Sequence, residues 1–198
     1  MPEMTFVEAI NAALREEMAR DKKVFIMGED VRNTVVSPAD AGLADEFGKD
    51  RVRNTPISEL GFTGAGVGAA MAGYRPVLDM RRIDFIMLAV DPITNQASKL
   101  RYMLGGQVSI PIVFRTPEGG GIQNGPTHSQ CLESMFLNVP GLHIVVPTSP
   151  ADAKGLLKTA IRDNNPVMFV EYLELYKMKG EVPEGDVTIP FGVANVCR

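Results

Sequence analysis

The sequence is poor in the residue types that mark several common classes of protein. Its 198 residues include no tryptophan, two cysteines and two histidines. Cys131 and Cys197 are far apart and lack metal-ligand spacing, so the sequence predicts neither a disulfide framework nor a zinc site. Such sparse cysteine use fits a reducing compartment, and we expect a cytoplasmic protein.

Charge of one sign and long apolar runs are also scarce. Lysine and arginine number 20 against 24 acidic residues, without a long block of like charge, which argues against a nucleic-acid partner. No apolar run approaches the roughly 20 residues that span a bilayer, so no membrane segment is expected. With 45% hydrophobic and 22% charged residues, the composition indicates a globular domain with a substantial core.

Short runs rich in β-branched residues alternate with longer helical patterns. The stretch 5–21 repeats apolar residues at helical spacing, and the stretch 149–165 opens with a capping residue, Ser149 or Asp152. This alternation predicts an α/β fold, a parallel sheet of about six strands with helices on both faces. Ligands in such folds bind beyond the carboxyl ends of the strands. The six strand candidates are "KVFIMG", "RVRNTP", "RPVLDM", "IPIVFRT", "LHIVVPT" and "PVMFVEY".

Two segments lack a regular pattern. The loop "TPEGGGIQNGPTHSQ", residues 116–130, directly follows a strand candidate and holds four glycines, and long loops of this kind are often functional. After residue 176 the pattern decays into turns. We therefore expect one domain over residues 1–176 and an extended arm or linker over residues 177–198.

The stretch "TPISELGFTGAGVGAAMAGYRPV" combines one carboxylate with many small residues. Residues 64–69 fit the G-x-G-x-x-G/A pattern of dinucleotide sites, but the glycines fall inside a predicted helix rather than in the turn after a strand. Gly64, Gly68 and Ala72 instead share a helix face that permits close approach of another element, such as a second subunit.

Three polar residues admit both structural and chemical interpretations. Glu59 is either a first-turn acid favoured by the helix dipole, worth roughly 0.3 to 1 kcal/mol, or a functional carboxylate. His128, in the glycine-rich loop, is either satisfied by a backbone carbonyl or is placed as an acid or base. His143, within an apolar strand candidate, is interpreted as structural.

A family resemblance extends over nearly the whole chain. The sequence closely resembles the beta subunits of the thiamin diphosphate-dependent 2-oxo acid dehydrogenases, the pyruvate, branched-chain and acetoin dehydrogenase group. The stretches that carry the resemblance are "MTFVEAINAALREEMARDKKVFIMGEDV", "TPISELGFTGAGVGAAMAGYRPV", "DFIMLAVDPITNQASKLRYMLGG", "THSQ", "PGLHIVVPTSPADAKGLLKTAIRDNNPV" and "GEVPEGDVTIPFG".

The resemblance implies a transketolase-like pyrimidine-binding domain of the thiamin diphosphate-binding fold. Glu59 matches the glutamate that hydrogen-bonds the cofactor's aminopyrimidine and promotes the imino tautomer. Phe85 matches the aromatic residue that stacks on the pyrimidine, and Glu29 is a further cofactor-binding position. His128 matches the loop histidine that faces the substrate. Glu59 and His128 are thus the expected catalytic residues.

Two ion sites are also implied. No "GDG" followed by an "NN" pair occurs, so an alpha subunit is expected to bind the diphosphate and its Mg2+. A structural site for a monovalent cation such as K+ is expected on this chain. It maps, largely through backbone carbonyls, to Ile112, Ala160, Ile161, Asp163 and Asn165.

The sequence departs from the family pattern in several places. Arg81 and Arg82 stand where relatives more often place apolar or amide side chains, and Pro92 replaces a usual glutamine. Relatives continue from the linker into a second α/β domain, which is expected to be absent here.

The leading hypothesis is the pyrimidine-binding half of a 2-oxo acid or acetoin dehydrogenase beta subunit. The expected partners are an alpha subunit, other beta chains and a lipoyl acyltransferase core. The alternatives are a non-catalytic truncated domain retained for assembly and the N-terminal half of a split transketolase-like enzyme. The motifs "THSQ" and "GEVPEG" favour the dehydrogenase group.

Overall fold

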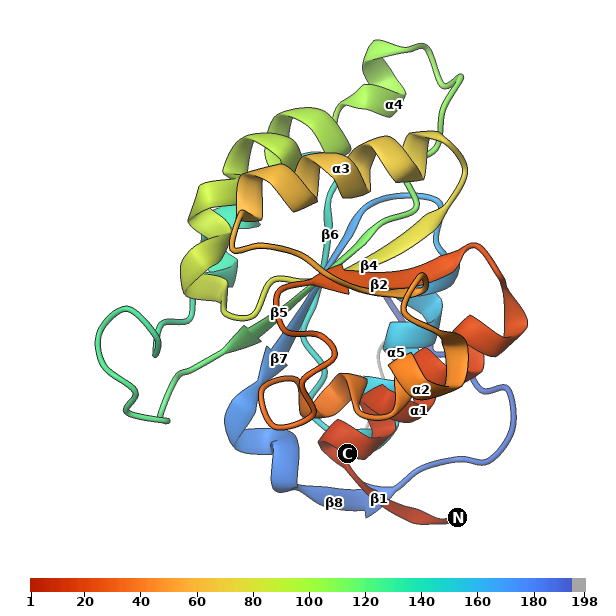
Figure 1. Ribbon diagram of the computed structural model, residues 1–198, viewed down its shortest axis with the longest axis vertical. Helices are drawn as coiled ribbons and strands as arrows, with labels where there is room; N and C mark the ends of the chain where they lie inside the picture. The colour runs from red at the N-terminus through yellow and green to blue at the C-terminus, as the bar shows by residue number, and fades with distance from the viewer. Residues whose placement is uncertain (194–198) are drawn as a thin grey trace.

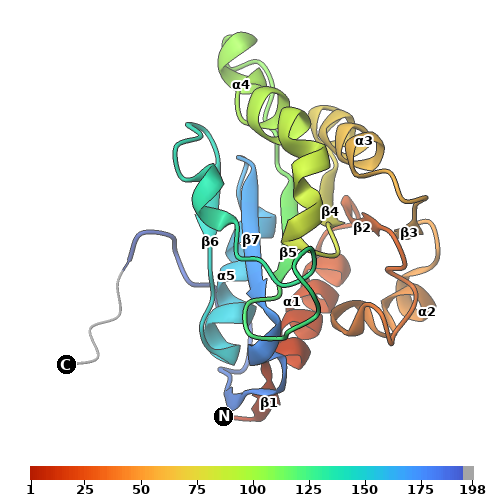
Figure 2. The same ribbon diagram turned by 90° about the vertical axis from the view of Figure 1, so that its left-hand side faces the viewer.

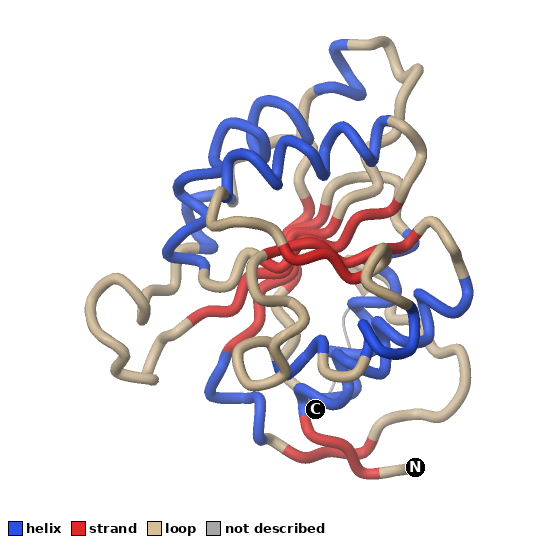
Figure 3. The backbone as a smooth tube through the Cα atoms, in the orientation of Figure 1, coloured by secondary structure: helices blue, strands red, loops and turns tan. Residues whose placement is uncertain are grey.

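The structure is a computed structural model that describes residues 1–193 of the chain. A parallel sheet of six strands lies at its centre (Figures 1 and 3). The strand order is β3-β2-β4-β5-β7-β6. Each strand coincides with one of the runs expected from the sequence, so the predicted fold class is confirmed. The strands are β2 (Val24–Gly28), β3 (Val52–Asn54), β4 (Arg75–Asp79), β5 (Val113–Glu118), β6 (His143–Val145) and β7 (Val167–Tyr172).

Helices cover both faces of this sheet (Figure 1). One face carries α3 (Glu59–Met71), the 3-10 segment η2 (Ile83–Ala89), the π-helical segment η3 (Pro92–Ala97) and α4 (Leu100–Met103); the other carries α1 (Phe6–Arg20) and α5 (Pro150–Arg162). Each layer buries its own apolar cluster against the sheet. In the described part of the chain, no helix is both long and apolar enough to cross a membrane. The remaining helical elements are η1 (Pro38–Asp40), α2 (Leu43–Phe47), η4 (Glu133–Phe136) and η5 (Leu173–Lys177).

Local sequence signals explain where α1 and α5 begin. Thr5 caps α1 through a reciprocal capping box with Glu8. At the start of α5 the Ser149 hydroxyl accepts a hydrogen bond from the main-chain nitrogen of Asp152 at 3.1 Å, so Ser149 is the cap. Both helices then bury one apolar face, as the helical spacing predicts.

Helix α3 presents two different glycine surfaces. A Cβ atom at Gly66 would lie 2.8 Å from a methyl group of the fully buried Leu78, so this glycine permits close packing of α3 on the sheet. Gly64 and Gly68 are exposed, and a Cβ atom there would meet nothing within 4 Å. The face formed by Gly64, Gly68 and Ala72 is therefore open in this chain.

A small antiparallel pair of strands lies apart from the main sheet. Strands β1 (Glu3–Thr5) and β8 (Lys179–Glu181) pair along three residues each, which ties the start of the expected arm to the N-terminal segment. Further along, Ile189 packs against Gly155 of α5. Figure 2 shows the arm leaving the body of the molecule, and residues 194–198 of the expected arm lie outside the described residues.

A buried ionic cluster joins the middle of the sheet to two peripheral elements. Arg115 of β5 donates to Asp40 of η1 at 2.7 Å and to Glu171 of β7 at 2.6 Å, and all three side chains are almost wholly buried. The hydroxyl of Tyr176, from η5, donates to Glu171 at 2.6 Å. Burial, reinforced by the nearby Asp79, raises the pKa of Asp40 to about 8, although Arg115 opposes the shift.

The two glycine surfaces predict opposite effects of the same substitution. Gly66→Ala should lower the free energy of unfolding by about 1 to 3 kcal/mol, because the added methyl group overpacks a closed core. Gly68→Ala should raise it by up to roughly 1 kcal/mol, because alanine favours a helix more than glycine does. Chemical denaturation of the isolated chain measures both, and equal shifts would contradict the difference in packing.

The raised pKa of Asp40 predicts a pH dependence of stability. The pKa of Asp40 is about 8 in the folded chain and lies near its ordinary value of 3.8 in the unfolded chain, so the folded state binds the extra proton between these pH values. The free energy of unfolding should therefore fall as the pH rises from about 4 to 8, by up to about 1.4 kcal/mol per unit from this group. Asp40→Asn should flatten the slope measured by denaturation at several pH values. An unchanged slope would show that Asp40 ionises normally in the folded chain.

Candidate functional site

Four residues expected to act on a cofactor or substrate follow four neighbouring strands. Glu29 comes directly after β2, Glu59 opens α3 after β3, Phe85 lies in η2 after β4, and His128 lies in the loop after β5. Because β3, β2, β4 and β5 are adjacent and parallel, their carboxyl ends meet at one edge of the sheet. The topology therefore brings these four positions to the same edge.

Two of these residues form a carboxyl pair. Glu59 is only 4% exposed although it stands in the first turn of α3. Burial, and then the charge of Glu59, raise the pKa of Glu29, while Arg81 opposes the shift. A helix-dipole role needs no burial, and burying a carboxylate is costly unless it is paired or protonated. The pair is therefore suited to hold a proton between its two members.

The other two residues bring their rings together. The rings of Phe85 and His128 meet edge to face with their centroids 5.2 Å apart. The Thr127 hydroxyl lies 3.2 Å from Nδ1 of His128, so the tautomer decides which of the two donates. Asp84, beside Phe85, accepts hydrogen bonds from the main chain and side chain of Gln130 at 3.3 and 2.8 Å. These two hydrogen bonds hold the loop that contains His128 against η2.

Gln130 is a positioning residue that the sequence did not single out as such. It is the last residue of the "THSQ" motif, so the motif was visible. Its partner Asp84 is 46 residues away in sequence, and no local pattern connects the two. Their pairing becomes apparent only when β4 and β5 are placed side by side.

The guanidinium group of Arg75 already lies at the expected cation site. Arg75 donates from Nη1 to the carbonyls of Ile161 and Asp163 at 3.0 and 2.9 Å. Asp163 also accepts from Asn165 through main chain and side chain, each at 2.8 Å, and the Ile112 carbonyl accepts from Val167 at 2.9 Å. Arg75 thus holds the carbonyl groups of Ile161 and Asp163, at the end of α5, close together.

These contacts limit how a cation would fit there. K+ could use only the lone pairs that the existing hydrogen bonds leave free, and the Arg75 guanidinium would oppose it electrostatically. Nothing in the contacts of Ala160 adds to the site. Within residues 1–193, no group of three or more His, Cys, Asp or Glu side chains is arranged to hold a metal ion.

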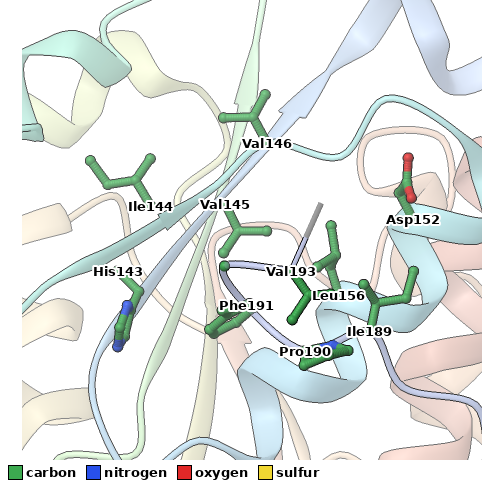
Figure 4. Close-up of a pocket in the computed structure, with 11 residues that line it drawn as sticks. His143, Ile144, Val145, Val146, Asp152, Leu156, Ile189, Pro190, Phe191 and Val193 are labelled. Carbon is green, nitrogen blue, oxygen red and sulfur yellow. The ribbon is translucent and has the colours of Figure 1, made fainter. Parts of the chain in front are cut away.

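A groove of about 820 Å3 lies away from these residues (Figure 4). It is formed by β6, α5 and the arm around Phe191, and none of the four expected cofactor or substrate residues lines it. His143 is exposed at its border, 5.5 Å from the ring of Phe191, rather than buried in an apolar strand. The groove is mostly apolar and marks the place where the arm crosses the edge strand.

Comparisons with known proteins show the family of the chain. A family model described as "Transketolase, pyrimidine binding domain" matches residues 2–179. The chain is 50% identical to the 2-oxoisovalerate dehydrogenase subunit beta of Bacillus subtilis (strain 168), over 100% of this chain and 61% of that protein. It is 47% identical to the mitochondrial pyruvate dehydrogenase E1 component subunit beta-2 of Oryza sativa subsp. japonica, over 99% and 54%.

A third relative has a different named substrate. The chain is 44% identical to the acetoin:2,6-dichlorophenolindophenol oxidoreductase subunit beta of Cupriavidus necator, over 96% of this chain and 59% of that protein. The chain thus spans a little more than half the length of these relatives.

The fold also matches a solved structure. The structure described as "Split gene transketolase, inactive beta4 tetramer" superposes with a TM-score of 0.74 at 18% identity, over 94% of this chain and 56% of that one. At this identity the likeness shows the fold alone. The chain belongs to the transketolase pyrimidine-binding domain family, and within it is similar to the beta subunits of the 2-oxo acid dehydrogenases.

Proposed function

We propose that this chain supplies the pyrimidine side of a thiamin diphosphate site in a 2-oxo acid or acetoin dehydrogenase beta subunit. The observation that carries the proposal is the buried carboxyl pair of Glu59 and Glu29 beyond the carboxyl ends of the strands. A carboxyl group in this setting can share a proton with a ring nitrogen. The beta subunits of pyruvate, 2-oxoisovalerate and acetoin enzymes among the relatives support this assignment.

The residues present fit the pyrimidine half of the cofactor. When bound, thiamin diphosphate supplies a thiazolium carbon that adds to the substrate carbonyl. Glu59 shares a proton with a pyrimidine nitrogen. Glu29, whose own pKa is raised beside Glu59, can hold a proton next to it. The half-buried Phe85 stacks its ring on the pyrimidine. His128 lies against Phe85, in the loop that the Gln130–Asp84 hydrogen bonds hold, and transfers a proton on the substrate side.

The diphosphate half of the site belongs to an alpha subunit in this proposal. The alpha chain binds Mg2+ and the diphosphate, and the acyl product passes to lipoamide on an acyltransferase core. The exposed face of α3 supports a subunit contact, since Leu60 and Met71 are 59% and 40% exposed beside the open glycines. Leu88 of η2, 62% exposed, extends the apolar surface on this side of the sheet.

The proposal predicts weak cofactor binding by the chain alone. With only the pyrimidine side present, the isolated chain should bind thiamin diphosphate and Mg2+ far more weakly than a complex with an alpha subunit. Calorimetric titration of both preparations measures the difference. Submicromolar binding by the isolated chain would place the diphosphate site here and overturn the division between subunits.

The role of Glu59 is tested in the reconstituted complex. Glu59→Gln should slow hydrogen–deuterium exchange at the thiazolium carbon by at least about a hundredfold, the loss typical of removing an acid–base group. Glu184→Gln, at an exposed position of the arm, is the control and should leave exchange unchanged. Exchange at the parental rate in Glu59→Gln would reduce Glu59 to a residue that interacts with the helix dipole.

A further inference from the structure

A small cavity lined by three arginines lies at the end of β4. It has a volume of about 190 Å3 and lies between the end of β4, the segment 35–39 and η5. Its wall includes three arginines, Arg81, Arg82 and Arg115, together with Ser37 and Tyr176. The volume far exceeds the roughly 10–15 Å3 that one water molecule needs, so the cavity can admit a small ligand.

The guanidinium groups of two of the three arginines already donate hydrogen bonds within the chain. The guanidinium group of Arg115 pairs with Asp40 and Glu171. Arg81 donates at 2.6 Å both to the Ser37 hydroxyl and to the carbonyl of Val36. Both side chains therefore act as parts of the wall.

Arg82 differs from both. Its Nη1 is buried, and among residues 1–193 it has no hydrogen-bond acceptor. Burial, and then the charge of Arg81, lower the pKa of Arg82. The charge of the nearby Asp84 partly offsets this lowering, but among residues 1–193 Asp84 makes no hydrogen bond to Arg82: its Oδ1 accepts from Gln130, and its Oδ2 is buried without a partner. A buried cationic donor without a partner is costly, and native structures seldom keep one without a bound acceptor.

The backbone presents this pair in an unusual way. Arg81 has a φ of 62°, the left-handed conformation that side chains rarely adopt, and its main-chain nitrogen donates to Asp79 at 2.8 Å. In this conformation the Arg81 side chain reaches the segment that contains Ser37. The following residue, Arg82, lines the cavity. Strained backbone of this kind is concentrated at ligand sites.

Positive side chains outnumber negative ones among the residues that line the cavity. Arg81, Arg82 and Arg115 line it, and Asp79 is the one acidic residue among the lining residues. Further carboxyl groups lie behind this wall, since Arg115 contacts Asp40 and Glu171, and the charge of Asp84 acts on Arg82. The inner surface of the cavity is therefore suited to an anion rather than to a cation.

We propose that this cavity binds a small oxyanion, a carboxylate or phosphate group, through the guanidinium group of Arg82, which lines it. A guanidinium group matches such oxyanions because it can offer two parallel N–H donors. The Ser37 and Tyr176 hydroxyl groups line the same cavity and can contribute further polar contacts. The site does not depend on the proposed cofactor function, since all of its walls belong to this chain.

Binding of simple anions to the isolated chain tests the proposal. Sodium acetate and inorganic phosphate are titrated separately at constant ionic strength and pH 7, with the melting temperature and the arginine Nε signals in 15N NMR as readouts. We expect saturable binding of at least one anion, and the tighter one identifies whether the site prefers a carboxylate or a phosphate. No saturable response to either would overturn the proposal.

Variants locate the binding. Arg82→Gln should weaken it at least tenfold, while Arg101→Gln, at an exposed arginine outside the cavity, should bind like the parent. Equal affinity in Arg82→Gln and the parent would also overturn the proposal. If Arg82→Gln does not fold, Arg82→Lys identifies the Arg82 signal in the parent spectrum. That signal must then shift on titration for the proposal to stand.

Discussion

The buried contacts of Arg115 hold together the elements on which the site is built. One guanidinium links β5 to β7 through Glu171 and to η1 through Asp40, and Glu171 in turn fixes Tyr176 of η5. Removing one partner of such a buried group typically costs about 3–5 kcal/mol, because a charge is left without compensation. The cluster lies near the carboxyl ends of the strands, so the same contacts that fix the sheet also fix the bases of the functional loops.

Long-range contacts then bring these loops into one site. Each of four adjacent strands is followed by one polar or aromatic residue at the same edge of the sheet. The hydrogen bonds between Asp84 and Gln130 hold the loop that contains His128 next to Phe85. Arg81 connects the carboxyl pair of Glu29 and Glu59 to the cavity lined by three arginines. It lines that cavity, and its charge opposes the rise in the pKa of Glu29.

The periodic parts of this arrangement could be predicted from the sequence, and the non-local parts could not. All six strands follow from patterns within a few residues of each position, and the same kind of pattern narrowed the cap of α5 to Ser149 or Asp152, of which the structure shows Ser149. The β1–β8 pair escaped prediction because three-residue strands carry too little periodicity. The cluster of Arg115, Asp40 and Glu171 escaped it because charged residues in a strand or loop look solvated until distant elements bury them. The positions of Glu59 and His128 came from the family resemblance rather than from physical pattern.

The open glycine face of α3 has a consequence for the life of the chain in a cell. Gly64 and Gly68 weaken the helix without filling any space in this chain, so α3 is a place where local opening is comparatively easy. A partner that covers this face removes that weakness by mass action, without any change in the fold. Unassembled copies would then expose α3 to proteases more often than assembled ones.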